Sequence, residues 1–262
     1  MNWRHFVGSR LRVLSHAVLA SRALPLSRYV PRGTFVLYDI QRFAQSRRLD
    51  VIFDVGANAG QSAWGFTRYF RDAQIYCFEP GRAAFTELID TYGPHHGLHC
   101  LNLALGEKSE TRELVVADTD TERSTFAPAP NMRHFPREIC KVIALDEFCA
   151  TEQISGIDLL KMDVQGWELA VLSGAQAMLR ANRVRFVLSE VGFVDDERDM
   201  TFFPHLHERM QSLGFRFCGF YDSYRYGQQK EFVGFSNALY VNPNWAKAIE
   251  ASEDAERRDR DM

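Results

Sequence analysis

Residues 51–60 read Val-Ile-Phe-Asp-Val-Gly-Ala-Asn-Ala-Gly, and this stretch decides the fold. Three apolar residues lead into Asp54 and a turn that contains Gly56, Asn58 and Gly60, after which the pattern is that of a helix. Glycines let a backbone turn sharply and approach a bound molecule closely. The spacing GxNxG differs from the GxGxxG of dinucleotide-binding loops and lacks the GK[ST] of a Walker loop. Asp54 would repel a diphosphate and attract an ammonium group.

Around this stretch, apolar runs alternate with helical patterns along the chain. We expect strands at 51–53, 74–78, 98–103, 113–117, 157–162, 184–188, 215–221 and 232–241, and helices at 60–70, 82–92, 167–179 and 202–213. Such alternation predicts an α/β fold with a mostly parallel sheet covered by helices on both faces. A short polar loop, residues 222–231, joins the last two strands and predicts an antiparallel pair at one edge. Because ligands of open sheets bind beyond the carboxyl ends of the strands, the residues that follow each apolar run are candidates for a site.

A second acid, Glu79, ends the strand expected at 74–78 and lies 25 residues after Asp54. A carboxylate at this place in a nucleotide-binding sheet can accept hydrogen bonds from both hydroxyls of a ribose. An acid for an amino group, an acid for a ribose and no cradle for phosphate together describe a site for S-adenosylmethionine (SAM).

Six stretches between about residues 50 and 241 resemble the FkbM-type SAM-dependent methyltransferases, in order and with compatible spacing. They are DVGANAG at 54–60, CFEP at 77–80, NLALGE at 102–107, VIALDEF at 142–148, DLLKMDVQGWELAVLSGA at 158–175 and LSEVG at 188–192. The resemblance implies a Rossmann-like seven-stranded methyltransferase sheet. It also implies transfer of a methyl group to a hydroxyl of a sugar, a glycolipid or a secondary metabolite.

The resemblance further implies which residues bind the cofactor. These are Asp54, Gly56, Asn58 and Gly60 around the methionine part of SAM, Glu79 at the ribose, Ala104, Leu105 and Asn102 around the adenine, and Asp163 facing the reaction centre. Many relatives have Glu where this chain has Gln165. We therefore expect SAM as the cofactor and do not favour a divalent metal.

A neutral hydroxyl that attacks a methyl group needs a proton acceptor, or a metal that lowers its pKa. Asp163 and Glu190 each follow an apolar run, and we expect the two strand ends to be neighbours, so one of these carboxylates would take the proton. Asp163 could instead contact the SAM amino group, act as a metal ligand or form a helix N-cap. Glu190 could instead form an ion pair with a nearby arginine. His134 is a third candidate base, because it lies in the polar, Pro-rich stretch 118–136 that could cover the acceptor.

Three other functions stay open from the residues alone. An enzyme of the same fold could act on a nitrogen acceptor, although a pI near 6.3 and the missing acid/amide-Pro-Pro-aromatic run count against nucleic acid. A NAD-dependent oxidoreductase should carry GxGxxG, which this chain lacks. A non-catalytic SAM-binding module usually loses the glycine loop, which is intact here.

The composition predicts one folded domain with two unusual ends. The chain has 262 residues, is 46% hydrophobic and 25% charged, and has a net charge of −3. We divide it into a basic helical extension at 1–48, a methyltransferase domain at 49–245 and a charged tail at 246–262. The five cysteines are scattered outside CxxC pairs, which favours free thiols and a cytoplasmic protein. The sequence contains no run of about 18 apolar residues, so it predicts no membrane-spanning helix.

The first 38 residues carry six arginines and no acidic residue. One interpretation is a basic amphipathic segment that contacts anionic lipid at the inner face of the membrane, or an acidic partner. The other is a helical cap packed on the domain. Ser15 and His16 interrupt the apolar region that a cleaved signal peptide would need. The sequence carries no signal for an oligomeric state.

Overall fold

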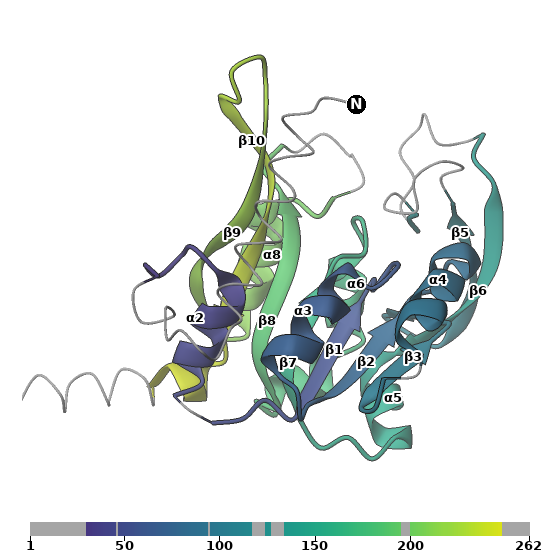
Figure 1. Ribbon diagram of the computed structural model, residues 1–262, viewed down its shortest axis with the longest axis horizontal. Helices are drawn as coiled ribbons and strands as arrows, with labels where there is room; N and C mark the ends of the chain where they lie inside the picture. Colours follow the sequence, from purple (N-terminus) through teal and green to yellow (C-terminus); the bar gives the residue numbers. More distant parts are fainter. Residues whose placement is uncertain are drawn as a thin grey trace, which may run out of the picture.

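A seven-stranded sheet in the order β3-β2-β1-β7-β8-β10-β9 forms the centre of the structure (Figure 1). The computed structural model describes residues 30–45, 47–93, 95–116, 124–126, 134–194 and 200–247. The strands of this sheet are β1 (Val51–Val55), β2 (Gln74–Phe78), β3 (Leu98–Leu101), β7 (Ile157–Met162), β8 (Val184–Gly192), β9 (Arg216–Tyr226) and β10 (Phe232–Val241). Each pair from β3 to β8 is parallel, whereas β10 is antiparallel to both β8 and β9. The α/β fold with a mostly parallel seven-stranded sheet and an antiparallel pair at one edge is confirmed.

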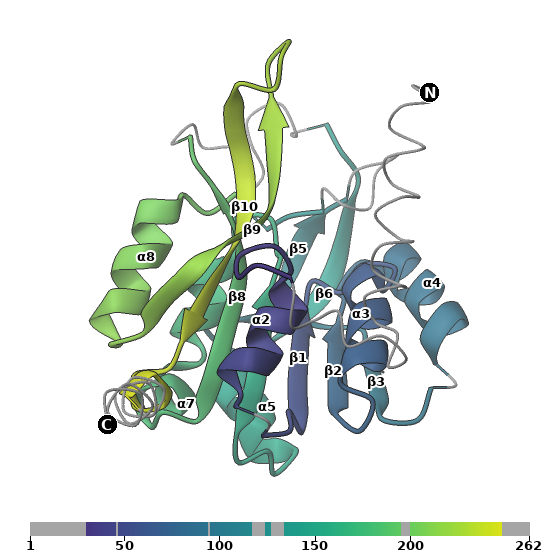
Figure 2. The same cartoon turned by 60° about the vertical axis from the view of Figure 1, so that its left-hand side comes forward.

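Two strands continue further than the sequence pattern predicts. Glu190 does not follow β8 but lies within it, because the end of β8 pairs with β10 as far as Gly192 and Phe235. β9 includes residues 222–226, which we expected in the loop, so the turn is only 227–231. Polar and aromatic residues fill that part of β9, which hides the strand from a search for apolar runs. The β9–β10 hairpin therefore projects past the sheet (Figures 1 and 2).

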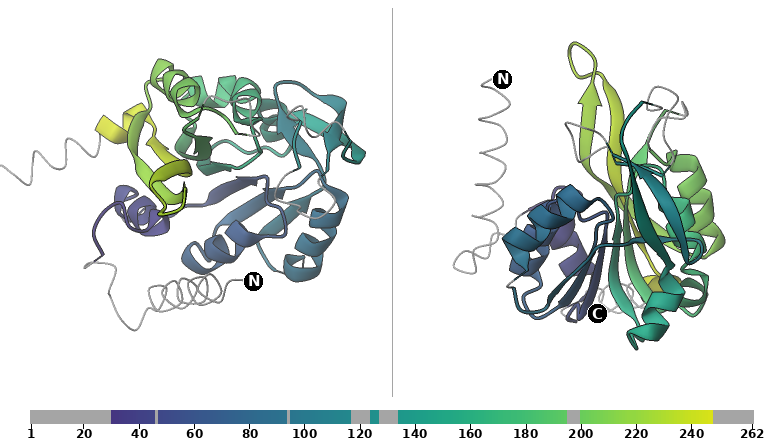
Figure 3. Two further views of the ribbon diagram at one scale, coloured as in Figure 1. Left: turned by 90° about the horizontal axis from the view of Figure 1, so that it is seen from above. Right: turned by 90° about the vertical axis from the view of Figure 1, so that its right-hand side faces the viewer.

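Alternation of side chains gives the sheet two buried faces. Ile52 and Leu159 pack on one side, whereas Phe53 and Leu160 pack on the other. The first side is covered by α2 (Val36–Phe43), α3 (Gln61–Tyr69) and α4 (Arg82–Tyr92), and we call it the α3 face. The second is covered by α5 (Leu145–Thr151), α6 (Glu168–Ser173), α7 (Gln176–Arg180) and α8 (Phe203–Ser212), and we call it the α5 face (Figure 3).

A second, three-stranded sheet lies beside the first. It consists of β4 (Ala104–Gly106), β6 (Arg137–Ala144) and β5 (Glu110–Val115), in that order, with β4 parallel and β5 antiparallel to β6. The pattern predicted only a strand at 113–117, because three of the six residues of β5, Glu110, Arg112 and Glu113, are charged.

The single helix expected at 167–179 is wrong, since α6 ends at Ser173 and α7 begins at Gln176. A Cβ atom at Gly174 would overlap the carbonyl oxygen of Gly106, so the chain bends where two backbones meet. The carboxylate of Asp146 accepts hydrogen bonds from the backbone N–H groups of Ala177 and Met178, at 2.7 and 3.0 Å. These two hydrogen bonds cap the first turn of α7 from Asp146, which is distant in the sequence. No local signal therefore predicts where the new helix begins.

Helix α2 packs against the α3 face and belongs to the same hydrophobic cluster as β1. Its Asp39 is 1% exposed and accepts hydrogen bonds from Tyr221 on β9 at 2.9 Å and from the backbone N–H of Gly33 at 2.6 Å. Arg42 pairs with the same carboxylate at 3.1 Å. Residues 30–45 thus pack as a helical cap, while residues 1–29 and the tail from 248 lie outside the described residues. None of the helices in the described ranges has the length and hydropathy to span a membrane.

We expect the Asp39 contacts to hold α2 on the sheet. Tyr221→Phe removes one hydrogen bond to a buried carboxylate and should lower the free energy of unfolding by about 1.5–3 kcal/mol. Asp39→Ala should cost more, because it leaves the Tyr221 hydroxyl and the Gly33 N–H without their acceptor. Urea unfolding measures both, with Glu87→Ala on the exposed side of α4 as a control expected within about 0.5 kcal/mol of wild type. Tyr221→Phe as stable as that control would contradict this role.

Candidate functional site

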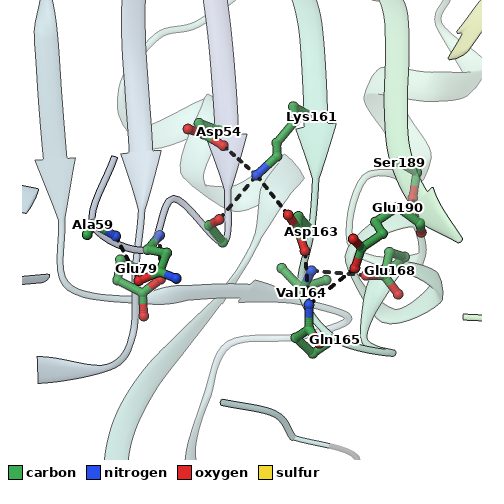
Figure 4. Close-up of polar contacts among 12 residues, drawn as sticks. Asp54, Ala59, Glu79, Lys161, Asp163, Val164, Gln165, Glu168, Ser189 and Glu190 are labelled. Atoms are coloured by element: carbon green, nitrogen blue, oxygen red, sulfur yellow. Dashed lines mark hydrogen bonds and ion pairs between the residues drawn. The ribbon is translucent and has the colours of Figure 1, made fainter. Parts of the chain in front are cut away.

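Four acids meet at the carboxyl edge of the sheet, as the sequence predicts. Asp54 lies in β1, Glu79 follows β2, Asp163 follows β7 and Glu190 lies near the end of β8 (Figure 4). Because β2, β1, β7 and β8 are parallel neighbours, these side chains share one end of the sheet.

The glycine loop takes its shape from contacts within the protein. Gly56 and Gly60 have positive φ angles of 76° and 94°. A Cβ atom at Gly56 would overlap the carbonyl oxygen of Asp163, and one at Gly60 would overlap the ring of Tyr92. Asn58 also has a positive φ, 47°, and its side-chain oxygen accepts a hydrogen bond from the next backbone N–H at 2.8 Å. The loop is thus seated directly against the end of β7.

Lys161 is a residue of the candidate site that the sequence pattern did not single out. Its ammonium group lies 3.0 Å from Asp54 and 3.5 Å from Asp163, and it donates a hydrogen bond to the carbonyl oxygen of Gly56 at 3.2 Å (Figure 4). Burial acts to lower the pKa of Lys161, but Asp54 and Asp163 together raise it above its usual value. A charged residue inside the apolar run 157–162 was the available signal, because lysine is almost never fully buried without a partner.

Asp54 is completely buried and faces this internal ammonium. Burial raises the pKa of Asp54, and the charge of Lys161 opposes that rise. Two carboxylates, those of Asp54 and Asp163, therefore surround the one ammonium group of Lys161. Asp163 is on the solvent side of this group, because its side chain is 34% exposed. The expected contact of Asp54 with the cofactor stays a prediction.

Glu79 is oriented by backbone groups from two loops. One carboxylate oxygen accepts a hydrogen bond from the N–H of Asn58 at 2.9 Å, and the other accepts one from Gly81 at 2.8 Å. Burial raises the pKa of Glu79 to about 7, although both of these hydrogen bonds act to lower it. The Asn102 amide braces the same loop, because it donates to the carbonyl oxygens of Glu79 at 2.9 Å and Pro80 at 3.0 Å.

The expected adenine contacts Ala104 and Leu105 lie in β4, which begins two residues after Asn102. Ala104 and Leu105 are 5% and 1% exposed and belong to two different packing clusters. Their contact with the base, like that of Asn102, stays a prediction.

The Gln165 amide brings the two candidate bases together. Its nitrogen donates to Asp163 at 3.0 Å and to Glu190 at 3.2 Å. Burial raises the pKa of Glu190 to about 9, and the charges of Asp163 and Glu168 add to the rise. A pKa of about 9 favours the protonated form of Glu190 at neutral pH. Asp163 is not a helix N-cap, since α6 begins five residues later.

A buried acid supports the segment that carries Asp163. Glu168 accepts hydrogen bonds from the Val164 N–H at 3.0 Å and from the Thr201 hydroxyl. The Thr125 hydroxyl donates to the carbonyl oxygen of Gln165 at 2.7 Å, so part of the stretch 118–136 reaches the site. His134 is exposed just before β6, and no described contact joins it to the acids.

We expect Lys161 to stabilise the folded protein mainly through its ion pair with Asp54. Lys161→Met leaves a buried carboxylate without its cation and should lower the free energy of unfolding by about 3–5 kcal/mol. Asp54→Asn in the Lys161→Met background should recover part of that loss, because the pair is then uncharged. A double-mutant cycle by urea unfolding measures the coupling, and strictly additive losses would show that the two groups do not depend on each other.

The acid-rich edge and the glycine loop coincide with a family match. The Methyltransferase FkbM domain matches residues 54–217. A relative named 2-O-methyltransferase NoeI, from Sinorhizobium fredii, is 25% identical over 153 residues, 53% of this chain and 62% of NoeI. Another, hexuronic acid methyltransferase AglP from Haloferax volcanii, is 26% identical over 159 residues, 58% of this chain and 60% of AglP. The chain thus spans about three fifths of these curated relatives.

Solved structures also resemble the chain, at lower similarity. Fibrillarin of Aeropyrum pernix, solved with bound S-adenosylmethionine, is 12% identical, with 74% of this chain and 67% of that chain covered and a TM-score of 0.42. A TehB-like methyltransferase of Corynebacterium glutamicum is 12% identical, with 92% and 100% covered and a TM-score of 0.39. The domain match alone covers more than half of the chain, which therefore belongs to the FkbM methyltransferase family.

Proposed function

We propose that this protein is a SAM-dependent O-methyltransferase that acts on a hydroxyl of a saccharide-containing acceptor. Family membership supports methyl transfer, and the names of NoeI and AglP, a 2-O-methyltransferase and a hexuronic acid methyltransferase, support a sugar acceptor. The observation that carries the proposal is the Asp163–Gln165–Glu190 cluster, which places two carboxyl groups joined by one amide beside the glycine loop.

The acids of the described site fit SAM. Each Glu79 oxygen accepts one backbone hydrogen bond, so each keeps a lone pair for a ribose hydroxyl. Asp163 offers a partly exposed carboxylate to the ammonium or sulfonium charge. The nearby cation, Lys161, is held between two carboxylates and is not directed at a phosphate. An excess of acids therefore favours a cationic cofactor over a dinucleotide.

When bound, SAM supplies an electrophilic methyl group. The chain's own residues then orient the acceptor hydroxyl, exclude water and receive its proton. We assign the proton acceptor to Asp163, because its side chain is 34% exposed at the open side of the ion pair and the raised pKa of Glu190 favours the protonated form of its partner. Glu190, already protonated, holds Asp163 through Gln165 and keeps further negative charge out of the site. We favour a route without a divalent metal, because a hydrogen-bond donor, the Gln165 amide nitrogen, lies between both carboxylates.

Affinity for SAM should depend on pH through Glu79. An ionised carboxylate accepts ribose hydroxyls better than a protonated one, and the pKa of Glu79 in the free protein is about 7. The dissociation constant should therefore be roughly tenfold higher at pH 6 than at pH 8. Glu79→Gln should bind more weakly and lose this dependence. Isothermal titration of SAM measures both, and NAD is the negative control. An unchanged, pH-dependent affinity in Glu79→Gln would exclude Glu79 as the ribose acid.

The two carboxyl groups should respond differently to amide substitution. Asp163→Asn removes the proton acceptor and should lower kcat by roughly 10²–10⁴-fold. Glu190→Gln replaces one neutral hydrogen-bonding group by another, so kcat should fall by no more than about tenfold at pH 7. The assay follows labelled methyl from SAM into fractionated cellular glycan and glycolipid extracts, and the labelled product identifies the acceptor.

Three outcomes would change this assignment. A larger loss in Glu190→Gln than in Asp163→Asn would make Glu190 the base. Full activity in both variants would exclude both and direct attention to His134. Activity lost in EDTA and restored by Mg²⁺ would overturn the metal-free route.

A further inference from the structure

The β9–β10 hairpin projects past the sheet (Figures 1 and 2), and four of its aromatic residues lie at and beyond the last pair between β8 and β10. We call Tyr224, Tyr226, Phe232 and Phe235 the hairpin aromatics. Tyr224 and Phe235 stack at 4.8 Å with 10° between their planes, and Tyr226 and Phe232 lie 5.5 Å apart. Tyr224, Tyr226 and Phe232 are 46%, 41% and 59% exposed. Large apolar groups that stay together in water commonly mark a binding surface.

Strand register relates the hairpin aromatics to the catalytic acids. Glu190 is paired with Asn237, and Gly192 is paired with Phe235. Paired residues lie on the same face of a sheet, and so do residues two apart on one strand. Leu239 and Leu188, further along the same alternation, pack on the α3 face. Glu190 and Phe235 therefore share that face, with Phe235 beyond the acid and Tyr224 stacked on it.

A glycine leaves room for these rings above β10. A Cβ atom at Gly234 would lie 3.2 Å from the ring of Tyr224 and 3.3 Å from that of Tyr226, which is closer than most Cβ atoms come to a neighbour. The ammonium group of Lys230 lies 5.3 Å from the centre of the Tyr224 ring. The surface thus combines flat aromatic rings, phenolic hydroxyls and one cation.

This chemistry fits a sugar chain. A pyranose ring has a flat face of C–H groups, which can pack on the negatively polarised face of an aromatic ring, and a rim of hydroxyls that can bond to tyrosine. Residues 232–235 span roughly 10 Å along the strand, enough for more than one sugar ring. Lys230 adds a preference for a sugar that carries a carboxylate.

We propose that the hairpin aromatics bind the sugar residues next to the methylated one, with a preference for an acidic oligosaccharide. The inference rests on the proposed function only in taking Asp163 and Glu190 as the place of reaction. It assigns acceptor selection to the edge hairpin, in addition to the stretch 118–136 that the sequence suggested as a cover for the acceptor.

The test measures saccharide binding without requiring turnover. The probes are an array of defined oligosaccharides, with glucuronate-containing and neutral members, and vesicles of phosphatidylglycerol and phosphatidylcholine. The variants are Tyr226→Ala/Phe232→Ala, Gly234→Val, which displaces the rings without removing one, and Lys230→Met. Ile139→Ala, another exposed apolar residue at 58% on β6, is the matched control.

Wild type should bind acidic oligosaccharides more tightly than neutral ones. Both ring variants should lose at least tenfold in affinity, Lys230→Met should lose only the preference for acidic members, and Ile139→Ala should match wild type. SAM affinity and the thermal unfolding midpoint should stay unchanged in all four variants, which separates lost contact from lost folding.

Three results would overturn the proposal: equal saccharide binding by wild type and the ring variants, no saccharide binding by wild type, or ring-dependent binding to vesicles instead of saccharides. Failure of the proposed function is distinguishable. It would appear as absence of SAM binding and methyl transfer while saccharide binding still depends on the hairpin aromatics.

Discussion

The buried ammonium group of Lys161 is the interaction on which the site depends. A charge taken out of water is costly unless it is paired and hydrogen-bonded, and Lys161 has three partners: Asp54, Asp163 and the carbonyl oxygen of Gly56. These partners come from β1, from the segment after β7 and from the glycine loop. One cation thereby sets the relative position of the three backbone segments that border the site. Gly56 makes this possible, because any larger residue would collide with Asp163.

The same cation acts on the protonation of the acids around it. The charge of Lys161 acts to lower the pKa of Asp54, Glu79 and Glu190, but it offsets only part of the cost of burying them. That cost raises the pKa of Glu79 to about 7 and of Glu190 to about 9. The edge brings four carboxyl groups to one ammonium group, so it offers hydrogen-bond acceptors for an ammonium group and ribose hydroxyls and no free cation for a phosphate among the groups described. Electrostatics and the glycine spacing therefore indicate the same class of cofactor.

Much of this could be predicted from sequence because it depends on local patterns. The apolar runs predicted the parallel strands, and the positions after these runs predicted Asp54, Glu79 and Asp163 as site residues. What failed depends on contacts between distant segments. The break between α6 and α7 follows from Gly174 against Gly106, and the extension of β9 follows from pairing with β10. Lys161 is visible in the sequence as a charged residue within an apolar run. Its contacts could not be predicted, because they depend on Asp54 and Asp163 both facing it in the folded chain.

Strand pairing also relates the edge hairpin to the acids at the sheet centre. Glu190 and Phe235 are held by one antiparallel ladder, in which a slip of one residue would turn every side chain of a strand to the opposite face. The acid and the aromatic surface are therefore locked to the same side by backbone hydrogen bonds. A loop can change its conformation without disturbing the sheet, whereas a change in this ladder would break the hydrogen bonds between β8 and β10. Under the proposed arrangement, an acceptor resting on the hairpin would meet Asp163 and Glu190 along this ladder, which would supply the positioning that a weak nucleophile requires.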